Sequence, residues 1–216
     1  MKIEAPARTA RPQPRARYAA QAICLLLAVV SPAGADDYVV VPGKPNLVRF
    51  ESQAPLESFD GKTSQVKGTL VLSPAALGDS IEVNLEVDLA SLDTGIAIRN
   101  KHMRENHLET AKHPHAIFRG GTVRKLSAPR LEPGAKVTFE IAGVLDLHGV
   151  QKPLAATVEL TSASGDQGPE LHVITRFDVK LSDFSIPRPK FLVMKLDEVQ
   201  KVTVDLVARR AAAPGS

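Results

Sequence analysis

The sequence predicts an all-β fold, an antiparallel up-and-down barrel of eight or nine strands with one short helix over an end. The first observation is an unbroken alternation of apolar and polar residues from Ile81 to Leu89. Successive side chains of a strand point to opposite faces, so this segment has one apolar and one polar face. The second observation is that this alternation recurs along the 216-residue chain. Such strands must bury their apolar faces together, and closure into a barrel leaves no exposed sheet edge.

Four predicted strands occupy the first half of the chain. Residues 38–41 form a short apolar run that ends at a Pro-Gly turn, and residues 47–52 alternate after it. Residues 65–72 alternate up to the turn at Ser73-Pro74. Residues 79–89 contain the long alternation described above. Turn residues at each boundary favour short connections between antiparallel strands.

Five predicted strands occupy the second half. Residues 116–123 are followed by residues 136–147, which place five large apolar side chains on one face. Residues 154–161, 171–181 and 199–208 repeat the alternation, with Gly, Pro and Asp between the runs.

One segment, residues 96–112, departs from the strand pattern. It has mixed charge and no β-branched run, its Met103 and Leu108 have helix-compatible spacing, and Pro114 lies beyond it. We expect a short helix over one end of the barrel. A sandwich of two sheets is the alternative that the periodicity leaves open.

The first 35 residues have the features of a cleaved secretory signal peptide. Basic residues precede an apolar run at 23–30, and the small residues 33–35 complete a cleavage site. The run is too short to span a bilayer as a helix. Cleavage after Ala35 predicts a periplasmic domain of residues 36–210 and a disordered tail at 211–216.

The charge and the cysteine count argue against several kinds of function. The chain has 27 basic and 24 acidic residues, but five of the basic residues and one of the acids lie in the leader. The processed chain is therefore nearly neutral, which argues against nucleic acid as a partner. Cys24 also lies in the leader, so the exported protein would have no thiol, disulfide or thiolate metal site.

Histidines are the first candidates for a chemical role. Four of the six fall between His102 and His115, and imidazole binds zinc, copper or iron. His102 and His107 are five residues apart, however, so a surface helix with scattered imidazoles is favoured over a metal site. His148 lies in a short loop before Gly149, where polar anchoring of the turn is favoured over contact with a ligand head group.

Catalysis has little support in the sequence. There is no G-x-S-x-G motif and no phosphate-binding glycine loop, and the carboxylates alternate outward along the strands. We expect no enzyme; a hydrolase or isomerase at the barrel mouth is the remaining alternative of that class. The apolar inward faces fit a packed core and a dry cavity equally well.

Several motifs along residues 38–208 occur in the order found in a known family. They are Y-V-V-V at 38–41, V-R-F at 48–50, G-T-L at 68–70 with S-P at 73–74, V-D-L-A-S-L-D-T-G at 87–95, R-N-K-H-M-R at 99–104, H-P-x-A-x-F at 113–118 and L-D-L-H-G-V-Q-K-P at 145–153. On these motifs the chain resembles the YceI-like family of exported lipocalin-like proteins.

The resemblance implies an extended eight-stranded lipocalin-like barrel whose apolar tunnel holds a polyisoprenoid, such as an isoprenoid quinone or its precursor. It carries over no catalytic residue, no metal and no cofactor apart from the lipid. A transient inner-membrane partner, a homodimer and a metal- or haem-linked module using the His102–His115 cluster stay open. The head group could meet Arg99, His102 or His148. The predicted ligand-binding residues are Phe50, Val83, Leu85, Val87, Met103, Phe118, Phe139, Ile141, Val173, Phe177, Val179 and Val204.

Overall fold

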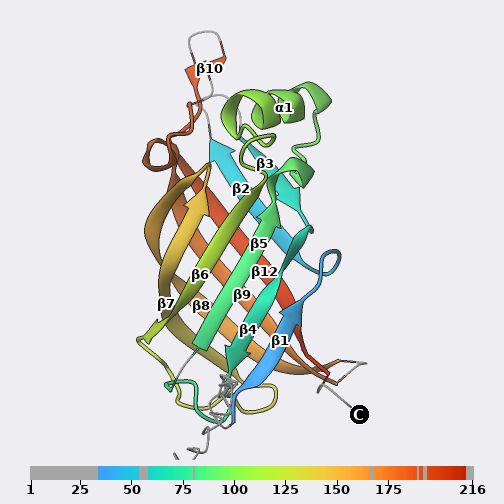
Figure 1. Ribbon diagram of the computed structural model, residues 1–216, viewed down its shortest axis with the longest axis vertical. Coiled ribbons are helices and arrows are strands. Elements are labelled where there is room, and N and C mark those ends of the chain that lie inside the picture. The colour runs from blue at the N-terminus through green and yellow to red at the C-terminus, as the bar shows by residue number, and fades with distance from the viewer. Residues whose placement is uncertain are drawn as a thin grey trace, which may run out of the picture. The chain divides into compact units, whose positions relative to one another are not determined.

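Ten strands join edge to edge in one antiparallel sheet that curls into a barrel (Figure 1). The computed structural model describes residues 34–53, 58–79, 81–165, 168–188, 190–191 and 194–212. The sheet contains β1 (Asp36–Val40), β2 (Leu47–Gln53), β3 (Ser58–Thr63), β4 (Val66–Leu72), β5 (Ile81–Asp88), β6 (His115–Arg124), β7 (Lys136–Leu147), β8 (Val150–Gly165), β9 (Gly168–Lys180) and β12 (Val199–Arg210). A separate hairpin pairs β10 (Lys190–Phe191) with β11 (Met194–Lys195).

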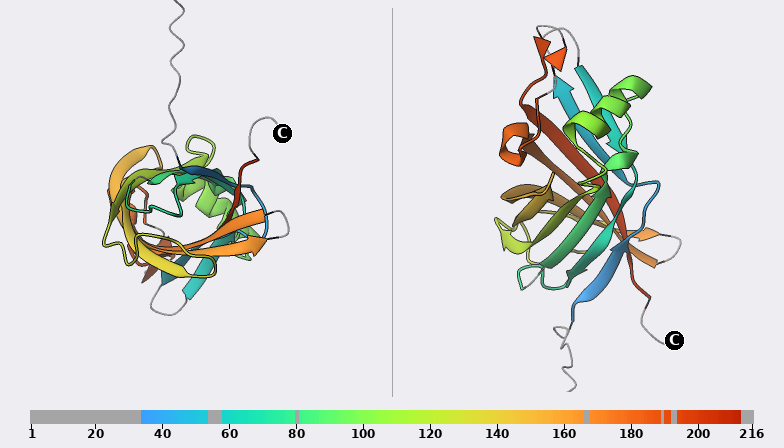
Figure 2. Two further views of the ribbon diagram at one scale, coloured as in Figure 1. Left: turned by 90° about the horizontal axis from the view of Figure 1, so that it is seen from below. Right: turned by 45° about the horizontal axis from the view of Figure 1, so that its top comes forward.

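The barrel closes by pairing its first strand with its last. The order around it is β1-β4-β5-β6-β7-β8-β9-β12, and β12 returns to β1 at Tyr38↔Arg210 and Val39↔Arg209. Figure 2 shows this closed ring from one end. Because one antiparallel sheet closes on itself in this way, the predicted eight-stranded up-and-down barrel is confirmed and a sandwich of two sheets is excluded.

Ten strands fill eight positions because β1 and β2 share one position, as do β3 and β4. β12 pairs with β2 along Lys201–Asp205 and with β1 at its far end. Asn46 secures the break between β1 and β2: its side-chain amide donates to the Val41 carbonyl (2.7 Å) and its side-chain oxygen accepts from the Val207 N–H (2.9 Å).

The alternation pattern does not predict β3. This strand contains a single large apolar residue, Phe59, and the next inward position along it is occupied by Gly61. The ring of Phe50 on the paired strand β2 fills that space, and a Cβ atom on Gly61 would clash with it. A neighbouring strand therefore supplies the apolar surface that β3 lacks. The strands β8 and β9 also extend beyond their predicted bounds into a polar hairpin.

The predicted helix lies over one end of the barrel (Figure 1). It consists of α1 (Ala97–His102) and a π-helical turn, η2 (Met103–His107). The helix ends earlier than the predicted residue 112, because Glu109 adopts a left-handed conformation with φ 43°. Two short 3-10 helices, η1 (Leu89–Ser91) and η3 (Leu181–Phe184), follow β5 and β9 at the same end.

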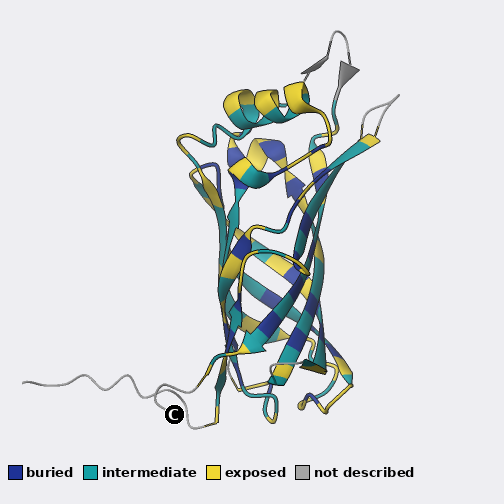
Figure 3. Cartoon of the chain, turned by 90° about the vertical axis from the view of Figure 1, so that its right-hand side faces the viewer, coloured by how far each residue is buried: buried dark blue, intermediate teal, exposed yellow. Residues whose placement is uncertain are grey.

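The opposite end of the barrel is closed by packed side chains. The segments after β4 and after β6 cross it and bond to each other through Leu77 N–H to Pro129 O (2.9 Å) and Leu131 N–H to Pro74 O (2.7 Å). Figure 3 shows buried positions alternating with exposed ones along the strands. The buried core residues of this end, which do not line the large cavity, are Tyr38, Val40, Leu77, Leu131, Val137, Leu171 and Ala208.

The leader and the end of the tail lie outside the described residues. Residues 1–33 of the predicted signal peptide and residues 213–216 of the predicted tail belong to this part of the chain. Within the described part, no helix has the length and apolar character needed to cross a membrane.

Candidate functional site

A cavity of about 770 Å³ occupies the barrel between the packed end and the helix. Its wall is formed by inward side chains from β2 to β9 and from β12. Since residues i and i+2 of a strand share a face, each strand contributes several apolar side chains in a row. On β5, for example, Val83, Leu85 and Val87 all line the cavity. The result is a long apolar chamber inside a closed sheet.

The helical segment covers the mouth of this chamber. Ile98, Met103 and Leu108 contribute apolar side chains to the lining, and His102 and His107 contribute imidazoles. Figure 3 shows exposed residues on the side of α1 that faces away from the barrel. The polar residues of the lining are therefore concentrated at the mouth. The mouth is formed by the short helical segment rather than by a strand.

Arg99 is held at the mouth by contacts that include Thr94 and the Phe59 ring. Its Nε donates to Thr94 Oγ1 (2.9 Å), its Nη2 donates to the Thr94 carbonyl (2.7 Å), and its guanidinium lies 4.1 Å from the centre of the Phe59 ring. Asn100 supports the same turn by donating to Asp93 (2.7 Å). Hydrogen bonds from Gly95 N–H and Asn100 lower the pKa of the Asp93 carboxyl. These contacts place a fixed cation beside an otherwise apolar chamber.

Few polar groups reach the interior of the chamber. Thr175 Oγ1 donates to the Thr157 carbonyl (2.8 Å) and Gln200 Nε2 to the Asp197 carbonyl (2.6 Å), so both side chains are already satisfied. Ser52 Oγ is buried and has no hydrogen-bond partner among the described residues. A ligand in this chamber would meet mainly hydrocarbon, and binding would be driven by the burial of apolar surface.

All twelve residues predicted to bind the ligand line this cavity, from Phe50 on β2 to Val204 on β12. Their contact with a bound molecule stays a prediction. Other residues of the lining were not predicted to bind the ligand. Among them are Phe59, on the unpredicted strand β3, and Ile186, which follows η3. Arg99 and His102, proposed for the head group, also line the cavity, but His148 does not.

The histidines between His102 and His115 do not form one cluster. His102 and His107 line the cavity mouth, whereas His115 on β6 lies 3.3 Å from Glu86. His113 instead lies against His148, with 4.7 Å between the ring centres. These four histidines therefore do not converge on one site, and the metal- or haem-linked alternative stays a prediction.

The pKa of His107 is lowered, chiefly by burial and further by His102, and a hydrogen bond to the Pro187 carbonyl (2.9 Å) only partly opposes this. The unfolded chain therefore takes up a proton more readily than the folded chain as the pH falls below 6.5. We expect the free energy of unfolding to drop between about pH 7.5 and about pH 5.5, and to drop less in His107→Gln. Urea unfolding at both pH values measures this. Equal pH dependence in the two proteins would contradict it.

A closed antiparallel barrel around a chamber of this size defines a binding protein of the lipocalin-like type. The YceI-like domain family matches residues 38–208, so the chain belongs to the YceI-like family. The chain is 29% identical over 170 residues to the UPF0312 protein VPA0850 of Vibrio parahaemolyticus, covering 76% of this chain and 85% of that one. It is 33% identical over 108 residues to the protein YceI of Escherichia coli O157:H7, covering 49% and 52%.

Two solved structures share the fold. One is a polyisoprenoid binding domain from Saccharophagus degradans, with a TM-score of 0.62 and 19% identity over 81% of this chain and 98% of that one. The other is BcnA of Burkholderia cenocepacia, with a TM-score of 0.60 and 16% identity over 75% and 95%.

Proposed function

We propose that this protein is an exported carrier that holds a long polyisoprenoid chain in the barrel and performs no catalysis. The observation that carries the proposal is the apolar chamber of about 770 Å³. Membership of the YceI-like family and the similar fold of a polyisoprenoid binding domain support the same ligand class.

The energetics of such binding depend on area. Burial of apolar surface contributes about 25 cal/mol per Å², so a long hydrocarbon chain gains affinity along its whole length without directional contacts. A satisfied polar group such as Thr175 adds little, because its hydrogen bond is already made within the sheet. We therefore expect the chamber to bind long, apolar ligands more tightly than short or polar ones.

The head group would lie at the mouth, beside the helical segment. Arg99 and His102 line that part of the cavity, and Arg99 is held in place by Thr94 and Phe59. Within this proposal the cargo is an isoprenoid quinone or a quinone precursor. The apolar tail would fill the chamber towards the packed end.

The proposed location is the periplasm. The basic start, short apolar run and small residues before Asp36 support export and cleavage after Ala35. A carrier in an aqueous compartment needs an enclosed chamber, since a free polyisoprenoid chain would otherwise stay in the membrane.

The first experiment is native mass spectrometry of protein purified without detergent, followed by organic extraction and lipid identification. A discrete extra mass that extracts as a long-chain isoprenoid is the expected result. A bare polypeptide that also takes up no added prenyl lipid would overturn the proposal.

Two aromatic side chains in the wall give a direct mutational test. Phe139 and Phe177 line the cavity from β7 and β9, and the double substitution Phe139→Ala, Phe177→Ala removes much of the surface that would contact the lipid. We expect less co-purified lipid per folded chain and faster loss to an acceptor membrane. If the folded double variant keeps the wild-type lipid content, these two residues are not part of the binding site.

A further inference from the structure

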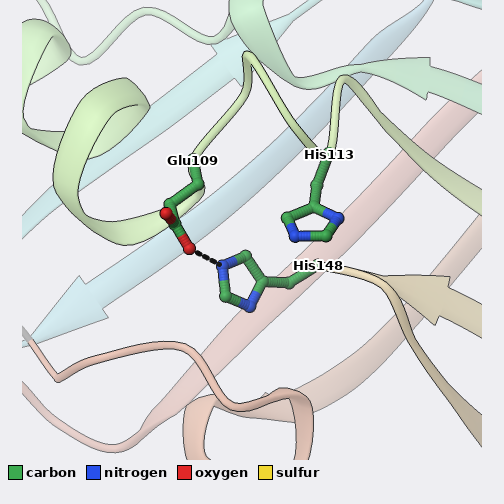
Figure 4. Close-up of side chains that lie close together, drawn as sticks. All are labelled: Glu109, His113 and His148. Carbon is green, nitrogen blue, oxygen red and sulfur yellow. Dashed lines mark ion pairs between the residues drawn. The ribbon is translucent and has the colours of Figure 1, made fainter.

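Three side chains that could ligate a metal gather beside the helical segment, outside the cavity lining. Glu109 and His113 lie in the connection between η2 and β6, and His148 lies in the turn between β7 and β8 (Figure 4). Their nearest ligand atoms all lie within 4.8 Å of one another. We propose that Glu109, His113 and His148 form a binding site for a zinc ion. Of the four histidines between His102 and His115, only His113 belongs to this site.

The environment of His148 fixes which ring nitrogen faces the other two residues. Its side chain is only 7% exposed, and its Nδ1 lies 3.0 Å from the Phe184 carbonyl oxygen. A carbonyl only accepts, so Nδ1 carries the proton and the Nε2 of the neutral ring presents a lone pair. A histidine ligand usually donates its second N–H to such a carbonyl, which orients the ring and makes it a better ligand.

The lone pair of Nε2 has no protein donor to meet. Nε2 is buried and lies 3.3 Å from Glu109 Oε2, which is an ion pair when the ring is protonated (Figure 4); on the neutral ring it has no hydrogen-bond partner among the described residues. On the neutral ring this buried nitrogen faces an acceptor, so its lone pair stays unsatisfied, which costs free energy, while the Glu109 carboxylate is partly exposed. A cation between them satisfies both atoms at once. Figure 4 shows the Glu109 carboxylate and the His113 ring on the same side of His148.

The spacing suits a tetrahedral ion. Zinc bonds to nitrogen and oxygen at about 2.0–2.1 Å, so two neighbouring tetrahedral ligands stand about 3.3–3.4 Å apart. The distance from His148 Nε2 to Glu109 Oε2 is 3.3 Å. His113 is half-buried and within 4.8 Å, so a small rotation of its ring completes the set. Two histidines and one glutamate are an established zinc ligand set that leaves a fourth position for water.

The local backbone leaves room for the His113 ring. The hairpin turn consists of His148 (φ 55°) and Gly149 (φ 74°), conformations typical of a two-residue type I′ turn. A Cβ atom on residue 149 would lie 2.8 Å from Cε1 of His113. Glycine is therefore needed both for the turn and for the close approach of the second imidazole.

The contacts of Glu109 favour the ionised form that a metal ligand needs. A hydrogen bond from Lys112 (2.5 Å to Oε1) is the main cause that lowers the pKa of the Glu109 carboxyl. Because Lys112 bonds to Oε1, the other oxygen, Oε2, is the one that faces His148. The Lys112 ammonium also competes with a metal ion for the Glu109 carboxylate, so it lowers the affinity of the site for the ion.

The position of the site predicts what a bound ion does. Glu109 and His113 belong to the segment that leaves the helix at the cavity mouth, whereas His148 belongs to the barrel wall. An ion that binds all three links the helical segment to the barrel. Since the unfolded chain does not bring these residues together, zinc binding must raise the midpoint of thermal unfolding.

The test is calorimetric titration of untagged protein, stripped of metal by a chelator, with Zn²⁺ as the probe. We expect saturation at one ion per chain and a higher unfolding midpoint with zinc present. His113→Ala and Glu109→Gln, both partly exposed and therefore safe for folding, should each weaken binding about tenfold or more. Lys112→Met should strengthen it, because the competing ammonium is gone.

The matched control is His115→Ala, which removes a neighbouring histidine that lies outside the site. It should bind zinc as the wild type does. The assignment is overturned if the wild type shows no saturable binding, if His113→Ala binds as tightly as the wild type, or if His115→Ala loses the ion as well. None of these readouts depends on whether the barrel contains lipid.

Discussion

Replacing Leu77 with alanine should lower the free energy of unfolding by about 2–5 kcal/mol, one of the largest effects of any single substitution in this chain. Leu77 is 0% exposed and belongs to the buried cluster at the packed end. It does not line the cavity, so its side chain is surrounded by other atoms on all sides. The substitution loses the transfer free energy of the side chain and leaves a void that the closed sheet cannot collapse to fill.

Urea unfolding measures this effect, with Val144→Ala as the control. Val144 is also a large apolar residue, but it is 41% exposed on the outer face of β7. Its truncation should change the free energy of unfolding by about 0.5 kcal/mol or less. Comparable losses in the two variants would mean that the packed end contributes no more to stability than the outer surface does.

The strands could be predicted where one face is apolar and the other polar. Residues 136–147 have the same bounds in the prediction and in β7, because the alternation is clear on both sides of the interruption at Ala142-Gly143-Val144. β3 shows where this reasoning fails. Its inward position at Gly61 is filled by Phe50 from β2, so the periodicity that would reveal the strand lies in its neighbour.

The cavity could not be predicted from the same pattern. Val137 and Phe139 share the inward face of β7, yet Val137 packs into the closed end whereas Phe139 lines the chamber. Alternation tells which face is buried but not how much space the opposite wall leaves. That space depends on where the segments after β4 and β6 fold across the barrel, and their sequences have no regular period.

The histidine site shows a third limit. The sequence favoured a role for His148 in anchoring its own turn, but its Nδ1 instead bonds to the carbonyl of Phe184 in η3, 36 residues further along the chain. The sequence grouped His113 with His115, two residues further along the chain. In the structure His113 lies against His148, whereas His115 lies beside Glu86. Contact between His113 and His148 depends on the register of β6 against β7, which no local pattern encodes.

Filling the chamber with a large side chain should abolish lipid binding while the barrel stays folded. Ala156 lines the cavity from β8, and Ala155 beside it is exposed on the outer face. In Ala156→Trp the indole enters open space rather than a packed core, so the cost of overpacking is small. The same space is then closed to an apolar chain, and we expect affinity for a prenyl lipid to fall about tenfold or more.

Ala155→Trp adds the same side chain on the outside of the same strand, and it should bind lipid as the wild type does. Native mass spectrometry gives the lipid occupancy of both variants, and circular dichroism checks that both are folded. A folded Ala156→Trp variant with full occupancy would place the lipid outside the barrel. Loss of lipid only when the tryptophan points inward would instead locate the ligand in the chamber at the level of Ala156, because the two variants differ only in the face of β8 that carries the ring.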